Sequence, residues 1–315
     1  MMRAAVIVNP AKADESHLRE RVSEELTAAG WSTPLWLQTT PEDPGYGMAR
    51  TAIEAGAQLV IVCGGDGTVM ACLGALAGTG VPLALIPLGT GNLLARNLGV
   101  PTQFAEALSV AVDGVDRRID LGRATDQPFA VMAGIGFDAA MMADASEGMK
   151  RIVGWPAYVV SGLRHLRDPV MSVRLSIDGG APLLRPARTV LVGNVCRLQG
   201  GLEVLLDAAS DDGLLDVVVV APRTLRDWIG VAWRVFRRRR TWHPHLERFR
   251  GRSILVEADR VMPRQLDGEV IDEGRGLDIR VEPDALVIRA PKSVARPADH
   301  KARGHLGREA NGRTR

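Results

Sequence analysis

Apolar and polar positions are arranged in two different ways along this chain. Up to about residue 119, short runs that are apolar at nearly every position alternate with segments of helical spacing. The runs at residues 4–8, 35–37, 59–63 and 83–86 read as strands, and the segments at 16–29, 48–55, 68–77 and 103–112 read as helices. Gly30 and Gly56 are expected to end the first two helices. Continuously apolar strands between helices predict a doubly wound, Rossmann-like parallel sheet with helices on both faces.

From about Asp120 the pattern changes to short strand-like runs separated by turn residues. These runs lie at residues 129–133, 172–177, 189–192, 214–220, 253–257 and 285–289, and helical segments near 149–167 and 224–240 interrupt them. Such spacing is typical of an antiparallel β-sandwich or barrel. We therefore expect an α/β domain at residues 1–119 and a β-rich domain at 120–297, whose last part packs back on the first domain, followed by a tail at 298–315.

The composition is that of a globular protein, with 46% hydrophobic and 24% charged residues and a formal net charge of +2. The tail is basic and poor in apolar residues, so we expect it to be disordered. Cys63, Cys72 and Cys196 show no metal-ligand spacing. Cys63 and Cys72 lie in apolar segments and are expected to be reduced core thiols of a cytoplasmic protein. The N-terminus lacks the apolar core of a signal peptide, and no run approaches the roughly 20 apolar residues that span a bilayer.

Two glycine-rich loops lie at the ends of neighbouring predicted strands. GGDGT at residues 64–68 and PLGTGN at residues 87–92 each follow a strand and precede a helix. Glycines let the backbone approach a ligand closely, and the free N–H groups at a helix start bind phosphate oxygens. The carboxylate of Asp66 can hold a Mg²⁺ ion at those phosphates. One loop alone would also fit a tight turn capped by Asp66, but two loops that converge on one crevice favour nucleotide binding.

With these two loops the sequence resembles the diacylglycerol kinase catalytic-domain family, which includes bacterial lipid kinases and sphingosine kinases. The resemblance extends from Ala4 to about Pro291. GGDGT alone is shared with NAD kinases, whereas the P-x-G-T-x-N form of the second loop favours the lipid kinases. The resemblance implies an ATP-dependent lipid kinase of phospholipid biosynthesis that uses ATP and Mg²⁺, with diacylglycerol as the expected acceptor.

Further family positions can be matched residue by residue. Asn9 and Pro10 match the family's N-P nucleotide-binding loop, but Ala11-Lys12-Ala13 follows where the family usually has Ser and Gly, so Lys12 can neutralise a phosphate instead. Thr40, with Thr39 as the neighbouring candidate, matches a threonine that lies at the nucleotide. The implied nucleotide-binding residues are Asn9, Pro10, Lys12, Thr40, Gly64, Gly65, Asp66, Gly67, Thr68, Gly89, Thr90 and Asn92.

Late in the chain, the segment QLDGE at residues 265–269 matches the family's D-G-E motif. The resemblance implies that Glu269 is the general base for the lipid hydroxyl and that Asp267 lies nearby in the catalytic site. A carboxylate is too weak a base to ionise an alcohol beforehand, but it can accept the proton as the bond to phosphorus forms. Without the resemblance, the segment reads as a hairpin turn, since Asp-Gly is a strong turn signal.

The segment DDGL at residues 211–214 resembles the family's acidic loop, which binds a structural Mg²⁺. The matching positions are the carboxylate of Asp212 and the backbone carbonyls of Ala209 and Leu214, although a simple Asp-Gly turn also fits. Residues 134–139 satisfy the loose dinucleotide pattern after a predicted strand. They lie in the β-rich part without a βαβ unit, so we reject a dinucleotide role.

Residues 224–240 have the pattern of an amphipathic helix with a cationic end at 237–240. Such a helix either packs on the core with a solvated basic face or docks on anionic lipid. The lipid substrate thus implies a peripheral protein at the inner face of the membrane. No nucleic-acid-binding module surrounds the basic cluster, so nucleic acid is not expected as a partner, and a homodimer is the default assembly.

Two other functions remain open from the sequence. An NAD kinase would use the same GGDGT loop on a soluble substrate. A non-catalytic nucleotide sensor or membrane adaptor would retain the fold but would have no need of a base such as Glu269.

Overall fold

The computed structural model describes residues 2–12, 15–136, 170–195, 208–222, 224, 226–227, 230 and 245–292. The predicted helix at 149–167, Cys196, the tail at 298–315 and most of the segment 224–240 lie outside these residues. The helices are α1 (Glu15–Ala28), α2 (Tyr46–Glu54), α3 (Asp66–Leu76), α4 (Leu93–Asn97) and α5 (Phe104–Asp113). The strands are β1 (Ala4–Val8), β2 (Leu35–Gln38), β3 (Leu59–Gly64), β4 (Leu83–Pro87), β5 (Val115–Ala124), β6 (Gln127–Phe129), β7 (Met132–Gly136), β8 (Met171–Ile177), β9 (Leu183–Ala187), β10 (Thr189–Gly193), β11 (Leu215–Val220), β12 (Leu246–Gly251), β13 (Ser253–Leu266) and β14 (Glu269–Ala290).

The N-terminal half is a parallel sheet with the strand order β4-β3-β1-β2. Successive residues of each strand face two different apolar cores. Ala5 and Ile7 of β1 pack in a core with α2 and α3, whereas Val6 and Val8 pack in a core with α1 and α5. The predicted parallel sheet with helices on both faces is therefore confirmed, because strands buried on both sides need apolar residues throughout.

The glycines that were expected to end helices do so. Gly30 follows α1 with a φ of +81°, and Gly56 follows α2 with a φ of +74°, a left-handed conformation in which glycine carries no steric cost. Cys63 and Cys72 are buried free thiols, as predicted. Cys63 lies in β3 and Cys72 in α3, so both serve as small apolar residues of the core.

The C-terminal half is antiparallel, and its strands follow the order β12-β11-β10-β7-β13, with β8 and β9 attached to β13. Their inward residues share one core, which includes Ile135, Val192, Val217 and Ile254. This confirms the predicted antiparallel β-rich part. The strands β13 and β14 are much longer than the apolar runs at 253–257 and 285–289 indicate. In β14 the additional residues are mostly polar and exposed, whereas β13 continues through a mixture of polar and apolar residues.

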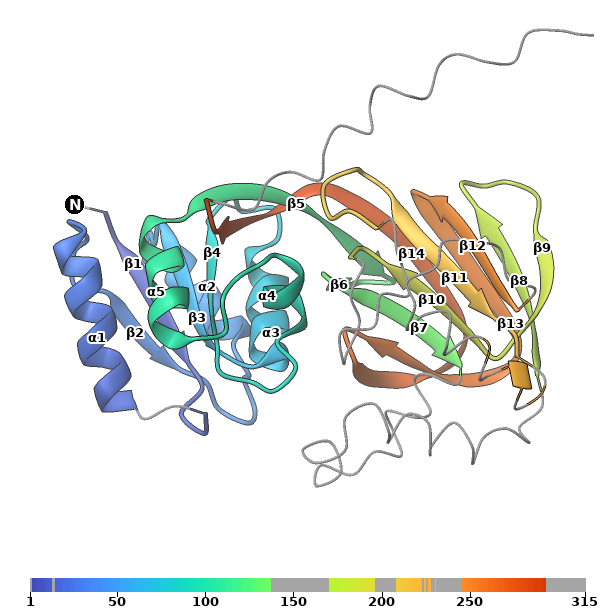
Figure 1. Ribbon diagram of the computed structural model, residues 1–315, viewed down its shortest axis with the longest axis horizontal. Coiled ribbons are helices and arrows are strands. Elements are labelled where there is room, and N and C mark those ends of the chain that lie inside the picture. The colour runs from blue at the N-terminus through green and yellow to red at the C-terminus, as the bar shows by residue number, and fades with distance from the viewer. Residues whose placement is uncertain are drawn as a thin grey trace, which may run out of the picture.

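Two long strands connect the halves, and Figure 1 shows β5 and β14 running between them. β14 pairs first with β13 and then with β5, and its register with β5 shifts between Glu282 and Leu286. At its far end Ile288 pairs in parallel with Leu83 of β4. The C-terminal strand thus returns to the N-terminal sheet, and hydrogen bonding continues from one half into the other.

Two expectations for residues 129–136 are corrected by the structure. The single strand expected at 129–133 is divided between β6 and β7, because the backbone N–H groups of residues 130–132 donate to the carboxylate of Asp267. Gly134 and Gly136 lie inside β7 and do not form a loop after a strand. A Cβ on Gly134 would lie 2.8 Å from Nε2 of Gln265, so this glycine makes room for a neighbouring side chain.

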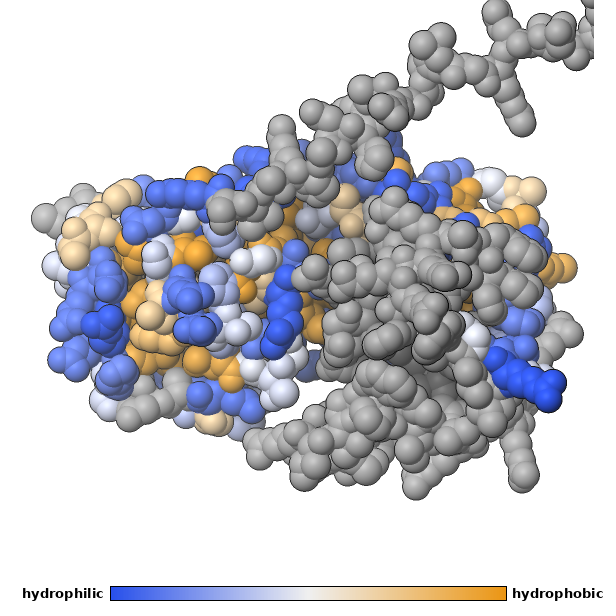
Figure 2. Space-filling view, viewed as in Figure 1, coloured by the Kyte–Doolittle hydropathy of each residue, from blue (hydrophilic) through white to orange (hydrophobic). Residues whose placement is uncertain are grey.

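The surface is polar over α1, at the left end of the view in Figure 2, where hydrophilic side chains predominate. This agrees with the sequence of α1, ESHLRERVSEELTA, which is dominated by charged and polar residues. Within the described part of the chain, no helix is long and apolar enough to cross a membrane.

Candidate active site

The loops that follow β1, β3 and β4 meet at the carboxyl edge of the parallel sheet. The backbone N–H of Asn9 donates to Cys63 O at 3.0 Å, and that of Leu88 donates to Gly64 O at 2.9 Å. The side-chain amide of Asn9 donates to Oγ1 of Thr68 at 3.4 Å. The structure therefore brings the N-P, GGDGT and PLGTGN segments together, as the pattern of strand ends predicts.

The two glycine loops touch through their backbones. A Cβ on Gly89 would lie 2.8 Å from Cα of Gly65, which leaves no room for a side chain at residue 89. Asn92 secures the second loop, because its Oδ1 accepts the N–H of Gly89 at 3.0 Å and its Nδ2 donates to Gly89 O at 2.7 Å. Asn92 itself has a left-handed backbone, with φ 49° and ψ 49°. The close packing of the loops thus explains why Gly89 and Asn92 occupy these positions, independently of any ligand.

Asp66 joins the loops through its side chain. It is the first residue of α3, and its carboxylate accepts the N–H groups of Asn92 at 2.8 Å and Leu93 at 2.6 Å. It therefore caps α4 and does not cap its own helix, as the sequence-based alternative of a tight turn capped by Asp66 would require. Burial raises the pKa of Asp66, while the two backbone bonds and the nearby Arg96 oppose that shift.

The loop after β2 is ordered by its own polar side chains. Oγ1 of Thr40 accepts the N–H of Asp43 at 3.1 Å, and the Asp43 carboxylate accepts N–H groups of Gly45 and Gly47. Thr39 is buried and donates its N–H to Val8 O, so Thr40 is the member of the pair that faces solvent. Its exposure leaves it accessible to a ligand at this edge of the sheet.

Pro10, Lys12 and Thr90 are exposed on the same edge of the molecule. The turn after β1 is held by Asn9, whose Oδ1 accepts the N–H of Ala11 at 3.0 Å and whose carbonyl accepts the N–H of Lys12. Lys12 is therefore exposed at the end of β1, the strand that pairs with β3.

Glu269 reaches the glycine loops from the other half of the molecule. It begins β14, opposite Leu266 of β13, and the two are joined by a two-residue turn at Asp267 and Gly268. Both turn residues have positive φ angles, 48° and 92°, which is the geometry of a tight hairpin. A Cβ on Gly67 would lie 2.9 Å from Oε1 of Glu269. The segment is therefore both a hairpin turn and a neighbour of the GGDGT loop.

Asp267, the first residue of that turn, has a buried side chain. Its carboxylate accepts the N–H groups of Ala130, Val131 and Met132 at 2.9, 2.8 and 2.7 Å. Burial raises the pKa of Asp267 to about 6; the three bonds lower it, and the charge of Asp66 raises it. With both oxygens accepting backbone N–H groups of residues 130–132, Asp267 holds the hairpin in place.

Three residues that sequence reasoning missed also support the hairpin. Oε1 of the fully buried Gln265 accepts the N–H of Gly268 at 2.8 Å. Arg264 donates from Nε to Oδ1 of Asp272 at 2.8 Å, pairs again through Nη2 and Oδ2, and donates from Nη1 to Gly276 O at 2.7 Å. Their polar character alone carries no signal for this role, because the partners become neighbours only when the strands pair.

The acidic loop at residues 211–214 is organised by another missed residue, Asp120. This buried carboxylate accepts the N–H groups of Gly213 at 2.7 Å and Asp284 at 2.9 Å, and burial raises its pKa. Asp212 accepts the N–H of Leu214 at 3.0 Å and forms an ion pair with Arg250. Ala209 and Leu214 are half-buried in the same loop.

The described residues contain no group of three or more side chains that would hold a metal ion by themselves. Mg²⁺ bound with a nucleotide needs only one or two carboxylates, because phosphates and water complete its shell. Asp66 fits this requirement, since each of its oxygens accepts one N–H and keeps a further lone pair. Asp212 fits less well, because the guanidinium of Arg250 already neutralises it.

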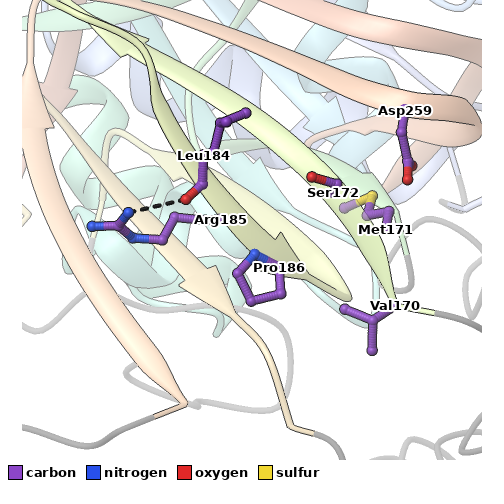
Figure 3. Close-up of a pocket in the computed structure, with 7 residues that line it drawn as sticks. All are labelled: Val170, Met171, Ser172, Leu184, Arg185, Pro186 and Asp259. Carbon is purple, nitrogen blue, oxygen red and sulfur yellow. Dashed lines mark hydrogen bonds between the residues drawn. The ribbon is translucent and has the colours of Figure 1, made fainter.

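A separate hollow lies on the C-terminal half, away from the glycine loops. It has a volume of about 410 Å³ and is lined by Val170, Met171, Ser172, Leu184, Arg185, Pro186 and Asp259 (Figure 3). Its lining residues come from β8, β9 and the middle of β13, and Arg185 donates to the carbonyl of Leu184. None of the predicted site residues lines it.

Comparison with known proteins covers nearly the whole described chain. Residues 3–124 match the family model "Diacylglycerol kinase catalytic domain", and residues 130–290 match "YegS C-terminal NAD kinase beta sandwich-like domain". A Pseudomonas aeruginosa protein named "Probable lipid kinase YegS-like" is 32% identical over 299 residues, which are 92% of this chain and 94% of that protein.

Two further relatives agree with this match. A diacylglycerol kinase of Bacillus subtilis is 28% identical over 276 residues, which cover 85% of this chain and 90% of that protein. The crystal structure of a diacylglycerol kinase from Bacillus anthracis strain Sterne superposes with a TM-score of 0.70 at 23% identity, covering 93% of this chain and 98% of that one. The Bacillus anthracis structure thus shares the two-part fold of this chain.

Proposed function

We propose a function from the premise that this chain belongs to the diacylglycerol kinase catalytic-domain family, a family of lipid kinases. The chain transfers the γ-phosphate of ATP to a hydroxyl group of a membrane lipid. Diacylglycerol is the proposed acceptor and phosphatidic acid the product, since the Bacillus subtilis relative bears the name diacylglycerol kinase.

The observation that carries the proposal is the position of Glu269. Its carboxylate lies beside Gly67, in the loop that also contains Asp66, although the two segments belong to opposite halves of the chain. A turn that only closed a hairpin would have no reason to place an exposed carboxylate against a glycine-rich helix start. A base for a phosphoryl acceptor must lie at this position.

The nucleotide phosphates are assigned to the glycine loops. The first N–H groups of α3, at Gly67 and Thr68, have no acceptor within the helix and favour anionic oxygens. Lys12, in the turn after β1, and Arg96, in α4, add positive charge at this edge of the sheet. Thr40 and Thr90 are exposed at the same edge, where their hydroxyls can donate to a nucleotide. Asn9 and Asn92 hold the loops in this arrangement.

The transfer step conserves atoms and charge as follows. The lipid hydroxyl oxygen forms a bond to the γ-phosphorus while the bond from that phosphorus to the β,γ-bridging oxygen breaks. The hydroxyl proton passes to the carboxylate of Glu269, and ADP leaves. Such a base contributes about 10²–10⁴-fold to the rate, and Asp267 acts on it only through the position of the turn.

A Mg²⁺ ion bound with ATP would be held by Asp66 and would supply positive charge at the phosphates. A second, structural ion is assigned to Asp212 with the carbonyls of Ala209 and Leu214. Because Asp212 is paired with Arg250, binding there would require the guanidinium to move away.

We further propose that the protein meets its substrate at the anionic inner face of the membrane as a peripheral cytoplasmic protein. The amphipathic segment 224–240, which motivates this from the sequence, lies largely outside the described residues. Assembly as a homodimer and the absence of a nucleic-acid partner stay predictions.

Labelled ATP distinguishes the possible acceptors directly. The purified protein is incubated with Mg²⁺, ATP labelled at the γ-phosphate, and either vesicles containing diacylglycerol, a total lipid extract, or NAD. Label in phosphatidic acid is the expected result. Label in NAD would replace the proposal with an NAD kinase, and nucleotide binding without transfer to any acceptor would indicate a sensor or adaptor.

Two variants test the assigned roles. Glu269→Gln is expected to lower transfer by about 10²–10⁴-fold while the unfolding temperature stays unchanged, since the Glu269 side chain is exposed. Asp66→Ala is expected to abolish transfer and also to lower the unfolding temperature, because the N–H groups of Asn92 and Leu93 lose their acceptor. Wild-type turnover in either variant would refute the role assigned to that residue.

A further inference from the structure

The strand that carries Glu269 exposes two aliphatic side chains directly after it. Val270 is 39% exposed and Ile271 is 37% exposed. In an ordinary strand one of two neighbouring residues faces the core, yet every residue from Glu269 to Glu273 is exposed. Something in the pairing of this segment must turn both aliphatic side chains outward.

The register of the hairpin explains their position. Glu269 pairs with Leu266 and Val270 with Gln265, but the next pair is Arg264 with Asp272, so Ile271 has no partner. A bulge of this kind breaks the alternation of faces and re-aims side chains. The ion pair in which the Arg264 guanidinium contacts both carboxylate oxygens of Asp272 fixes the conformation of this bulge.

Among the residues that the structure describes, the same segment pairs with another strand on one side only. β13 is paired on its far side with β7 through Arg264, Gln265 and Leu266, whereas β14 begins to pair with β5 only at Ile279. An apolar edge is usually protected in native proteins by charge, by a short length or by a covering group. Here two aliphatic residues stand on such an edge within two residues of the proposed base.

We propose that Val270 and Ile271 form an apolar lip that contacts the acyl chains of the lipid acceptor while its hydroxyl lies at Glu269. This inference rests on the function proposed above and specifies how the acceptor is held. Residues along a strand are about 3.4 Å apart, so the lip lies within roughly 7 Å of the base along the chain. In diacylglycerol the first ester-linked chain begins at the carbon next to the one that bears the hydroxyl, which matches this short separation.

The charges around the lip indicate the class of lipid. Glu269 and Glu273 are exposed carboxylates on the same strand, Asp272 is neutralised by Arg264, and the exposed cation of Arg275 lies farther along the strand, so the charge nearest the lip is negative. A negative field at the acceptor side repels a headgroup that already bears a phosphate. The lip therefore favours an uncharged acceptor, such as diacylglycerol or ceramide, over phosphatidylglycerol.

The test compares the double variant Val270→Ser/Ile271→Ser with Leu255→Ser. Leu255 is a matched control, because it lies on β13 in the same half and is 39% exposed, but it is remote from the turn. For each protein, kcat/KM is measured with a long-chain diacylglycerol in mixed micelles and with a short-chain, water-soluble diacylglycerol, together with KM for ATP. Phosphatidylglycerol in mixed micelles serves as the charged acceptor.

The double variant is expected to lose about 10-fold in kcat/KM for the long-chain acceptor, from the lost burial of two aliphatic side chains. Its kcat/KM for the short-chain acceptor and its KM for ATP should change by less than about 2-fold, and its unfolding temperature by less than about 2 °C. Leu255→Ser should behave as wild type. Val270→Thr, which exchanges a methyl for a hydroxyl at constant shape, should show a smaller loss in the same direction. Wild type should prefer diacylglycerol over phosphatidylglycerol.

Other results separate the lip from the function itself. If wild type phosphorylates no lipid, the proposed function fails and the lip fails with it. If wild type is active but the double variant matches Leu255→Ser, the lip is refuted while the function stands. An equal loss with short and long chains would refute acyl contact in favour of a role in positioning Glu269. A dimer that the double variant abolishes would assign the lip to a second copy of the chain and refute it as a lipid contact.

Discussion

Gly67 and Glu269 lie so close that a Cβ on the glycine would be 2.9 Å from Oε1 of the glutamate. Gly67 is in the first turn of α3 and Glu269 begins β14. Glycine at this position leaves space for the carboxylate, and its helical backbone would accept any residue. This contact links the GGDGT loop of one half to the proposed base of the other.

Gly67→Ala is expected to retain the fold and to lower the rate of phosphoryl transfer. Alanine is the better helix former, and the contact falls on the end of a flexible side chain, so the unfolding temperature should stay level or rise slightly. Glu269 must move by a few tenths of an ångström, which should lower kcat by about 10-fold. Steady-state kinetics and thermal unfolding of the purified variant measure both effects.

Gly74→Ala is the matched control on the same helix. A Cβ there would lie 3.6 Å from Cδ2 of Tyr46, an ordinary contact distance, so both stability and turnover should be those of wild type or slightly higher. Equal turnover of Gly67→Ala and Gly74→Ala would show that the position of Glu269 is not important for the rate.

Asp267→Asn should change how stability depends on pH. The raised pKa of Asp267, about 6 against an ordinary 3.8, means that the folded chain binds the proton more tightly than the unfolded chain between these values. The contribution of this group to the free energy of unfolding is therefore largest below about pH 4 and falls as pH rises to about 6. From pH 4.5 to pH 7 the loss should be about 2 kcal/mol.

Denaturant unfolding of wild type and Asp267→Asn at several pH values isolates this term, because all other titrating groups are shared. The difference in free energy of unfolding, wild type minus variant, should decrease as pH rises through the window. At pH 7 wild type should still be the more stable, since an amide cannot accept all three N–H groups of residues 130–132. If the free energies of unfolding of the two proteins changed in parallel with pH, the raised pKa of Asp267 would be contradicted.

Arg264→Gln should reduce turnover without affecting nucleotide binding. The ion pair of Arg264 with Asp272 lies next to the bulge at Ile271 and fixes the register that aims Glu269. Its loss should lower kcat about 10-fold, while the dissociation constant for ATP, measured by calorimetry, stays within about 2-fold of wild type.

A double-mutant cycle with Asp272→Asn tests whether the pair acts as a unit. The two single variants and the double variant should show similar losses in kcat. Arg174→Gln is the control, because its pair with Glu257 joins two side chains that are 56% and 50% exposed on the same half and should contribute little. If the losses in kcat from Arg264→Gln and Asp272→Asn add independently, the ion pair does not act as a unit on Glu269.

Much of the fold could be predicted because its causes are local. Apolar strands followed by helices indicated the parallel sheet, Gly30 and Gly56 marked two helix ends, and the turn residues after Asp120 indicated antiparallel strands. The glycine loops and the Asp-Gly turn were also visible, since each requires particular residues at fixed spacing. Strand extent was predicted poorly, as in β14, where exposed polar residues carry no apolar signal.

By itself, the sequence determined which segments become strands, helices and tight turns, and which residue types could hold a nucleotide. Only the tertiary structure decided that Asp66 caps α4 on the second loop, that Asp267 is buried under the hairpin, and that Glu269 stands against Gly67. The reason is physical: periodicity and turn chemistry depend on neighbours in the chain, whereas these contacts join segments far apart in sequence. They arise because β5 and β14 cross between the halves and set one against the other.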